Sequence, residues 1–214
     1  MIGIGALREA GYNVVTWDPR GEWRSGGRMQ LQSPDFEGRD VSHIISHLAT
    51  LSEVELDGVN DPKLGMVGAS YGGGIQLATA AIDHRIDAIV PTIAWNSLTD
   101  VLFPPDEAVR SGWGTLLSSV LVLTLSRPNP RILPAAIVAI ITGYTSQSDI
   151  DLLDDRGYAD QIGDITAPDA AHPGHGGHVV HAGAGRSQRE GAHRGGGDHD
   201  KGAVVLRRSR RLPE

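Results

Sequence analysis

The chain has 214 residues, enough for a domain with its own hydrophobic core, and a formal net charge of −7. It contains no cysteine, which excludes disulfide bonds, thiolate metal sites and a cysteine nucleophile. The acidic balance argues against a nucleic-acid partner, and no apolar run reaches the roughly 20 residues that a membrane span requires. No charged and then apolar leader opens the sequence, so the default expectation is a cytoplasmic protein without a membrane partner.

Composition changes abruptly near residue 168. Residues 169–214 hold ten Gly, seven Arg and six of the nine His, and they contain no Phe, Trp, Tyr, Ile or Met. Their eight Lys and Arg against five Asp and Glu give +3, whereas residues 1–168 carry eleven against 21, which is −10. So little apolar surface cannot support independent folding. We therefore predict a folded domain over residues 1–168 and a low-complexity, disordered tail over residues 169–214.

The first elements are a helix end, a strand and a second helix. Residues 1–11 predict a helix that Gly11 closes, and the apolar run Tyr12–Trp17 predicts a buried strand. A chain that opens in this way lacks the earlier strands of a parallel sheet, so we expect a truncation at its N-terminus. After a Gly-rich loop over residues 22–32, Ser33 is expected to cap a helix that has Pro34 in its first turn. The core face of this helix is expected to comprise Val41, Ile44, Ile45, Leu48 and Leu51.

Ser70, with glycines two residues before and two residues after it, follows the apolar run that begins at Leu64. Gly68-Ala69-Ser70-Tyr71-Gly72 stands between a predicted strand that starts at Leu64 and a helical pattern that starts near Ile75. A lone G-x-S-x-G is a weak signal, because an ordinary Gly-rich turn also produces it. Between a strand and a helix it predicts a nucleophile elbow, in which the serine hydroxyl stands clear on a strained turn. The Tyr71 N–H, at the start of the helix, would then face a developing oxyanion.

Residues 85–95 predict the next strand, so strands and helices alternate. This rhythm predicts a doubly wound, mainly parallel α/β sheet with ligands at the carboxyl ends of its strands. Residues 97–160 break the rhythm with two apolar runs, 116–125 and 132–142, which are too short to cross a bilayer. Their place after a strand suggests a helical cap over the site. Extra core helices that do not contact substrate are the alternative.

Histidine and arginine clusters offer candidate metal and nucleic-acid sites. His43 and His47 lie four residues apart on the predicted helix, but no third ligand is evident, so solvated histidines are expected. In the tail, His172, His175, His178 and His181 recur every three residues, but Gly and Pro between them prevent a helix that would align them. The arginines of residues 207–211 lack aromatic platforms. We expect no metal, no other cofactor and no nucleic-acid partner.

Three segments carry a family resemblance. Residues 17–21 (WDPRG), 68–74 (GASYGGG) and 87–91 (DAIVP) together resemble the Xaa-Pro dipeptidyl-peptidase and cocaine-esterase-like branch of the α/β-hydrolases. The resemblance runs from about Ile4 to Pro168. It implies a partial α/β-hydrolase fold with a cap inserted after the strand that ends near Trp95.

The resemblance also implies roles for single residues. Ser70 would form an acyl intermediate, and the Tyr71 N–H would donate to the oxyanion. Gly68 and Gly72 would support the turn. We expect Asp18 and Arg20 to brace the loop beneath the site in a structural role. The implied reaction is hydrolysis of a small-molecule ester or a peptide amide; the choice between them, like the oligomeric state, stays open.

No general base or acid is identified. A serine nucleophile needs both, and family members carry the acid after a match to Ile165–Pro168 and the histidine later, in segments resembling TLLIQGTVDTLFTL and WFCGGHG. Neither segment occurs here. Reading the codons of residues 169–183 one base later allows every residue of the first segment, and the same shift over residues 204–214 allows the second. We therefore hypothesise an out-of-frame translation from about Asp169, which would impair activity. The alternative function is an inactive remnant or a weak binding module.

Overall fold

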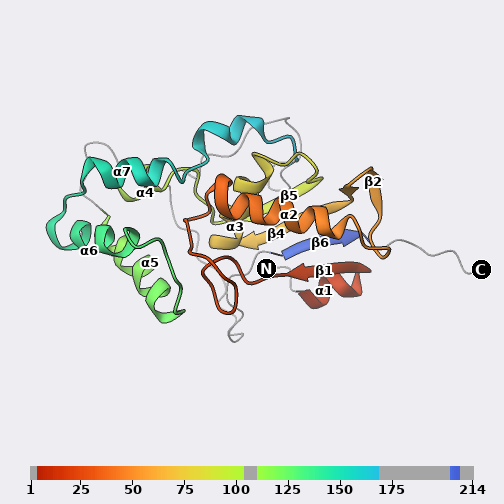
Figure 1. Ribbon diagram of the computed structural model, residues 1–214, viewed down its shortest axis with the longest axis horizontal. Helices are drawn as coiled ribbons and strands as arrows, with labels where there is room; N and C mark the ends of the chain where they lie inside the picture. Colours follow the sequence, from red (N-terminus) through yellow and green to blue (C-terminus); the bar gives the residue numbers. More distant parts are fainter. Residues whose placement is uncertain (1–3, 104–109, 169–202, 208–214) are drawn as a thin grey trace, which may run out of the picture.

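The computed structural model describes residues 4–103, 110–168 and 203–207. Its centre is a four-stranded sheet in the order β1-β6-β4-β5 (Figure 1). The strands are β1 (Tyr12–Thr16), β4 (Leu64–Ala69), β5 (Ala88–Thr92) and β6 (Ala203–Arg207). β4 and β5 are parallel, and β6 is antiparallel to both of its neighbours, so β1, β4 and β5 share one direction. The result is a mixed α/β protein consistent with a partial α/β-hydrolase fold.

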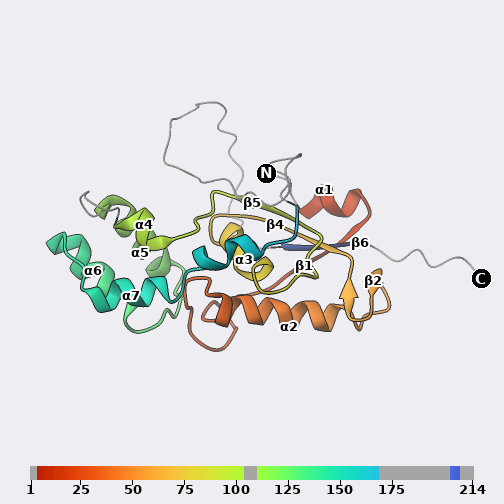
Figure 2. The same cartoon turned by 90° about the horizontal axis from the view of Figure 1, so that it is seen from above.

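Helices cover both faces of this sheet. α2 (Arg39–Leu48) and α3 (Tyr71–Ala80) lie on one face, and α1 (Ile4–Glu9) lies on the other (Figure 2). α3 contains no charged residue, and every residue from Gly72 to Ala80 is buried. A helix that is apolar all round is stable only in the interior, so this composition places α3 between the sheet and α2. A short hairpin of β2 (Leu56–Gly58) and β3 (Asp61–Pro62) links α2 to β4.

The core lies between α2, α3 and the sheet. Val41, Ile45 and Leu48 of α2 are buried, as the helical spacing predicted, whereas Leu51 is 37% exposed. Their partners across the core are Leu64, Met66, Ile75, Ala78, Ile89, Val204 and Leu206. Because fully burying a large apolar side chain contributes about 1.5–3 kcal/mol, this cluster stabilises the position of α3 against the sheet.

The start of the second helix differs from the prediction. Ser33 makes no side-chain capping bond, and residues Pro34–Gly38 form a wide π-helical turn, η1, in which the Gly38 N–H donates to the Ser33 carbonyl over 3.0 Å. The Ser33 N–H is instead bound by the Glu37 carboxylate, 3.1 Å away. This resembles a capping box extended by one residue, because the wider turn places Glu37 where a third residue would otherwise stand.

Four helices gather at the end of the sheet toward which β1 and β4 point (Figure 1). They are α4 (Leu98–Leu102), α5 (Ser111–Leu123), α6 (Ile132–Thr142) and α7 (Gln147–Asp154), and a 3-10 turn, η2 (Ala159–Asp164), leads back to the sheet. The two apolar runs predicted after β5 are therefore helical. Within the described residues, none of the helices has both the length and the apolar character that crossing a membrane would require.

Two sequence predictions need correction at the sheet. β1 was expected to be buried, but it is an edge strand whose Tyr12 is 42% exposed. The tail was expected to be disordered throughout, but its residues Ala203–Arg207 form β6, which fills the space between β1 and β4. Val204 and Leu206 point into the core and are 0% and 1% exposed. Burial between two strands overrides the polar composition around this short apolar run. The rest of the tail lies outside the described residues.

Candidate active site

Ser70 occupies the sharp turn between β4 and α3. Its backbone has φ +52° and ψ −117°, a region that non-glycine residues rarely adopt. The Ser70 N–H donates to the Thr92 carbonyl of β5 over 2.8 Å, and its carbonyl accepts from the N–H groups of Gly73 and Gly74. The turn is therefore held from both sides, which is how a surrounding structure maintains a strained conformation.

The glycines around Ser70 are required by close backbone contacts. A Cβ on Gly68 would lie 2.7 Å from the Gly72 carbonyl oxygen, and one on Gly73 would lie 2.8 Å from the Thr92 carbonyl oxygen. Both distances are shorter than any side chain allows. The predicted strand, turn and helix are present, and Gly68 and Gly73 provide the close approach that lets the chain reverse at Ser70.

Tyr71 is the first residue of α3, so its N–H is one of the donors that a helix N-terminus leaves without an intrahelical partner. The Tyr71 carbonyl accepts a hydrogen bond of 2.5 Å from the Gln32 side-chain amide. The Tyr71 ring lies 6.2 Å from the Trp95 ring, and its hydroxyl is buried without a partner among the described residues. Burial raises the pKa of this phenol well above its usual value, so the side chain stays neutral.

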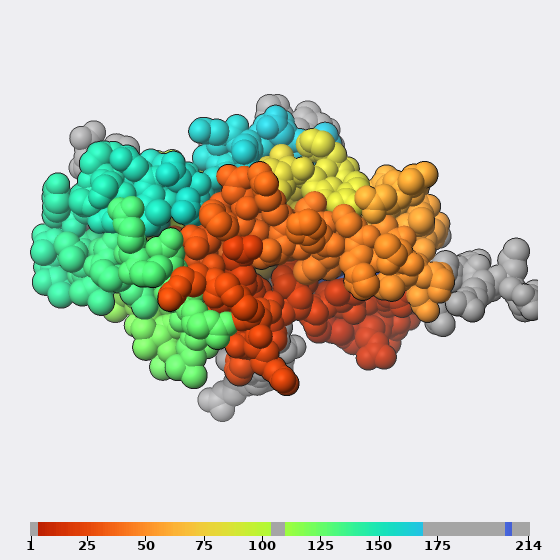
Figure 3. Space-filling model, in the orientation of Figure 1, coloured from red at the N-terminus to blue at the C-terminus, as the bar shows by residue number. Residues whose placement is uncertain are grey.

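A cavity of about 460 Å³ opens beside Ser70 and extends beneath the four helices. Tyr71, Trp95 and Leu31 line it from the side of the sheet. From the helices it is lined by Leu98, Leu102, Leu117, Leu121, Ile132 and Leu153. The α5 residues Gly114, Leu117, Ser118 and Leu121 follow helical spacing, which explains why one face of α5 meets the cavity. The space-filling view shows the loop after β1 seated between these helices and the sheet (Figure 3).

The acidic side chains at this cavity already have partners. Glu22 accepts a short hydrogen bond from the Ser126 hydroxyl. Asp149 is paired with Arg131 at 2.8 Å and accepts from Ser146 at 2.6 Å, and these contacts lower its pKa. Thr145 Oγ1, by contrast, is buried at the cavity without a partner among the described residues. The lining of the cavity is therefore mainly apolar, with two acidic side chains, of which Asp149 is ion-paired.

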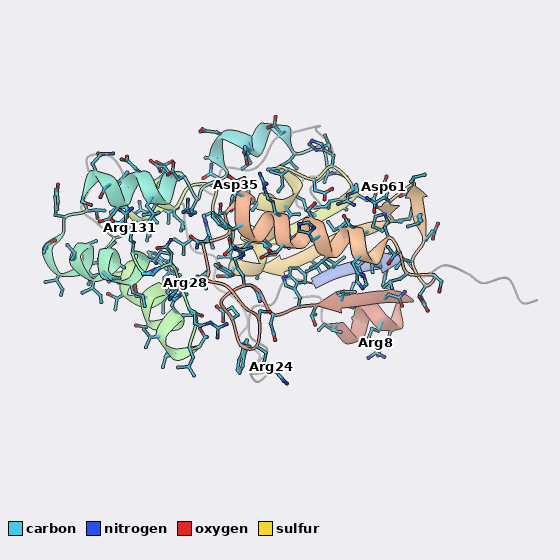
Figure 4. The ribbon with its side chains drawn as sticks, viewed as in Figure 1. Arg8, Arg24, Arg28, Asp35, Asp61 and Arg131 are labelled. Carbon is cyan, nitrogen blue, oxygen red and sulfur yellow. The ribbon has the colours of Figure 1, made fainter. Side chains whose placement is uncertain are left out.

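The loop over residues 21–32 joins the cap helices to the sheet. The Met29 N–H donates to the Arg127 carbonyl over 2.9 Å, and the Arg127 N–H donates to the Gly21 carbonyl over 2.8 Å. Arg28 reaches the Pro128 carbonyl at the boundary between the loop and α5, while Arg131 ties the start of α6 to α7 (Figure 4). The position of the cap over Ser70 thus depends on this loop.

A second, more polar cavity of about 640 Å³ lies behind Tyr71. It contains Arg20, whose guanidinium makes two hydrogen bonds of 2.6 and 2.7 Å to Asp40 and stacks 5.2 Å from the centre of the Phe36 ring. The Asp18 carbonyl accepts from the Ser25 hydroxyl over 2.6 Å. Arg20 braces the loop through Asp40 of α2, a partner that the sequence analysis had not assigned. Glu37 also lies in this cavity; it follows Ser33 by four residues, one more than a capping box has, and the sequence predicted no role for it.

No histidine among the described residues is hydrogen-bonded to the Ser70 hydroxyl, and none of the described residues form a cluster that could hold a metal ion. His172, His175, His178 and His181 lie outside the described ranges. Residues 165–168 form no strand, but the Pro168 carbonyl accepts from the Ile89 N–H over 3.2 Å. The chain thus reaches the edge of β5 where the described part of the domain ends.

Comparison with known families matches residues 5–144 to the X-Pro dipeptidyl-peptidase (S15 family). The chain belongs to this family. The S15 family is a hydrolase family, and the match spans the loop after β1, the Ser70 turn, α5 and α6.

The proteins that this S15 chain resembles are longer than the chain itself. It is 30% identical over 115 residues to the uncharacterized protein YcjY of Escherichia coli (strain K12), covering 53% of this chain and 33% of that protein. It is 29% identical over 91 residues to the uncharacterized protein PA2218 of Pseudomonas aeruginosa, covering 42% of this chain and 23% of that protein. A crystal structure of hypothetical protein PA2218 matches with a TM-score of 0.33 and 22% identity, over 50% of this chain and 33% of that chain. The chain thus spans no more than a third of these relatives.

Proposed function

We propose that Ser70 is the nucleophile of a serine hydrolase site that cleaves uncharged esters carrying a bulky apolar group. The observation that carries the proposal is the position of Ser70, at φ +52° on the turn before α3 and at the mouth of an apolar cavity. A hydroxyl raised on such a turn is open to a carbonyl carbon on the cavity side.

The chemistry would proceed through an acyl-serine. Ser70 Oγ attacks the ester carbonyl carbon and loses its proton, and the carbonyl oxygen becomes an oxyanion that the Tyr71 N–H stabilises. Collapse of this intermediate breaks the bond to the alkoxy group, which leaves as the alcohol after it takes up a proton. Water then attacks the acyl-serine and releases the carboxylic acid and the free Ser70 hydroxyl. The described residues assign no base to these proton transfers.

An ester with an apolar group is favoured over an Xaa-Pro peptide because the cavity walls are mainly apolar. A peptide with a free amino terminus needs a carboxylate to balance its ammonium. Of the two acids at the cavity, Asp149 is ion-paired with Arg131, whereas Glu22 is bound by the neutral hydroxyl of Ser126. The apolar lining, rather than the acids, therefore supports an uncharged substrate.

A second candidate is a module that binds apolar ligands in the same cavity without turnover. It is favoured by the sequence, in which neither the acid segment nor the histidine segment of the family occurs. Loss of the base lowers the rate by several orders of magnitude but leaves binding intact.

Labelling separates the two candidates. The purified chain is treated with an alkyl fluorophosphonate, and Ser70→Ala serves as the control variant. Phosphonylation of the unmodified chain that Ser70→Ala abolishes supports the hydrolase. Absence of labelling, together with binding of a neutral aromatic ester to both chains, would favour the module. Absence of both would reject the site altogether.

We also propose that the tail from about Asp169 arises from a shifted reading frame. The proposal rests on the two family segments that one shift recovers. Resequencing the gene and measuring the intact protein mass test it, because a confirmed frame with the mass of the present sequence would reject it.

A further inference from the structure

The loop beside Ser70 is held in an unfavourable backbone conformation. Leu31 and Gln32 have φ values of +59° and +65°, so two successive non-glycine residues adopt the left-handed region. Each costs free energy and persists only where surrounding contacts impose it. These contacts must therefore be identified to explain the loop.

Glu37 makes contacts on both sides of this pair. One carboxylate oxygen accepts from the Gln30 N–H over 2.5 Å, and the other accepts from the Ser33 N–H over 3.1 Å. Leu31 and Gln32 are the two residues between these amides. The Glu37 side chain is 2% exposed, so water does not replace either bond.

The two held residues face the site. The Leu31 side chain lines the cavity beside Ser70. The Gln32 side chain is 2% exposed and donates 2.5 Å to the carbonyl of Tyr71, the residue whose N–H would meet the oxyanion. A chain of contacts therefore runs from Glu37 through the loop to the first residue of α3.

We propose that Glu37 is a positioning residue, which acts through residues Gln30–Ser33 to fix Tyr71 and the cavity wall next to Ser70. The proposal rests on the proposed function, because a positioning role requires that Ser70 and Tyr71 react with a substrate. It adds to the proposed site a residue outside the Ser70 turn, and it predicts that the geometry of the site depends on pH.

The ionised form of Glu37 is the form that fits this geometry. A carboxylate accepts both N–H groups, whereas a protonated carboxyl has one oxygen converted to a donor, so one amide loses part of its bond. Burial raises the pKa of Glu37 to about 7. The loop is therefore tightened as the pH rises through neutrality and loosened as it falls.

Other titratable and charged groups face Glu37 from the elements packed around it. Arg20 favours its ionised form through space but is bound to Asp40 of α2. Tyr71 on α3 stays neutral. Arg156, beyond η1, stacks 5.1 Å from the Phe36 ring and donates to the Gln30 side chain. His43 of α2, Asp18 and Arg24 line the same cavity, so the Glu37→Gln variant is needed to assign a midpoint to Glu37.

The test is an NMR titration of backbone amides in the full chain, from about pH 5 to about pH 8. The Gln30 and Ser33 amide resonances are expected to move with a midpoint near the pKa of Glu37. The Tyr71 and Gly72 amides are expected to move with the same midpoint. Movement of Gln30 and Ser33 without Tyr71 and Gly72 would overturn the proposal, since Glu37 would then act only on its own loop. Absence of any midpoint near neutrality would also overturn it.

Variants localise the coupling. In Gln32→Met, the Gln30 and Ser33 amides should still titrate while Tyr71 and Gly72 no longer follow. Glu37→Gln should remove all four responses. Asp35→Asn serves as the matched control, because Asp35 lies two residues away, is 70% exposed and pairs only with Arg39 at the surface. Unchanged Tyr71 shifts in Gln32→Met would contradict the route through Gln32.

The reactivity of Ser70 toward the fluorophosphonate provides a second measurement. Glu37→Gln should slow phosphonylation of Ser70 about tenfold at neutral pH and flatten its pH profile, while Asp35→Asn should do neither. An unmodified chain whose amides titrate as expected but whose Ser70 is never labelled would reject the proposed function and leave the coupling in place. Normal labelling of Ser70 without coupled amide shifts would support the proposed function and reject the positioning role of Glu37.

Discussion

Because Glu37 is buried, the free energy of unfolding of the chain should fall measurably as the pH rises toward neutrality. Its pKa is about 7 in the folded chain against an ordinary value of 4.5, because burial disfavours the charged form. A raised carboxyl pKa means that the folded state binds the proton more tightly than the unfolded state. The stability that this group contributes is therefore complete below about pH 4.5 and is lost as the pH rises to about 7.

The size of the loss follows from the two pKa values. Each pKa unit corresponds to about 1.4 kcal/mol, so the free energy of unfolding should fall by about 3 kcal/mol over this range on account of Glu37. Glu37→Gln resembles the protonated form and does not titrate. It should match the unmodified chain within about 1 kcal/mol near pH 4.5 and exceed it by about 3 kcal/mol at pH 8.

Urea denaturation of both chains at several pH values measures this difference directly. Asp35→Asn, with its exposed carboxylate, should follow the unmodified chain. Two denaturation series whose difference stays constant from acidic to alkaline pH would refute the reasoning, because Glu37 would then have an ordinary pKa. If the difference appears, Glu37 is a residue that reduces stability at neutral pH while it orders the site, a known form of trade-off.

Three further predictions follow from the geometry. Gly68→Ala should lower the free energy of unfolding by about 1–3 kcal/mol and abolish Ser70 labelling, because its Cβ would lie 2.7 Å from the Gly72 carbonyl oxygen; a melting curve and a labelling assay check this. Leu121→Trp should fill the apolar cavity and weaken binding of a neutral aromatic ester at least about tenfold by equilibrium titration, whereas Leu116→Trp, whose position is 52% exposed, should not. Val204→Asp should cost at least about 3 kcal/mol in urea denaturation if β6 completes the sheet, because the position is 0% exposed; a change below 1 kcal/mol would show that β6 is dispensable.

Local patterns gave a good account of the elements that surround Ser70. Glycines at positions 68 and 72, an apolar run before them and a helical pattern after them predicted the strand, turn and helix that are present. The spacing of Val41, Ile45 and Leu48 predicted the buried face of α2. These features depend on neighbouring residues and on a periodicity that each segment carries by itself.

Contacts between distant segments were beyond such patterns. Nothing in the local sequence pairs Arg20 with Asp40 or turns Glu37 inward, because both depend on how η1 packs against the loop after β1. Ser33 has the residue type of a helix cap, yet its hydroxyl makes no capping bond, because the helix opens with the wide turn η1.

The sequence by itself determined the alternation of strands and helices, the position of Ser70 on its turn and the family, since each is written in short-range spacing. Only the tertiary structure decided that β6 lies between β1 and β4, that the cap helices enclose an apolar cavity, and that Glu37 governs the loop beside the site. Those outcomes depend on which surfaces exclude water from one another, and that is a property of the whole folded chain.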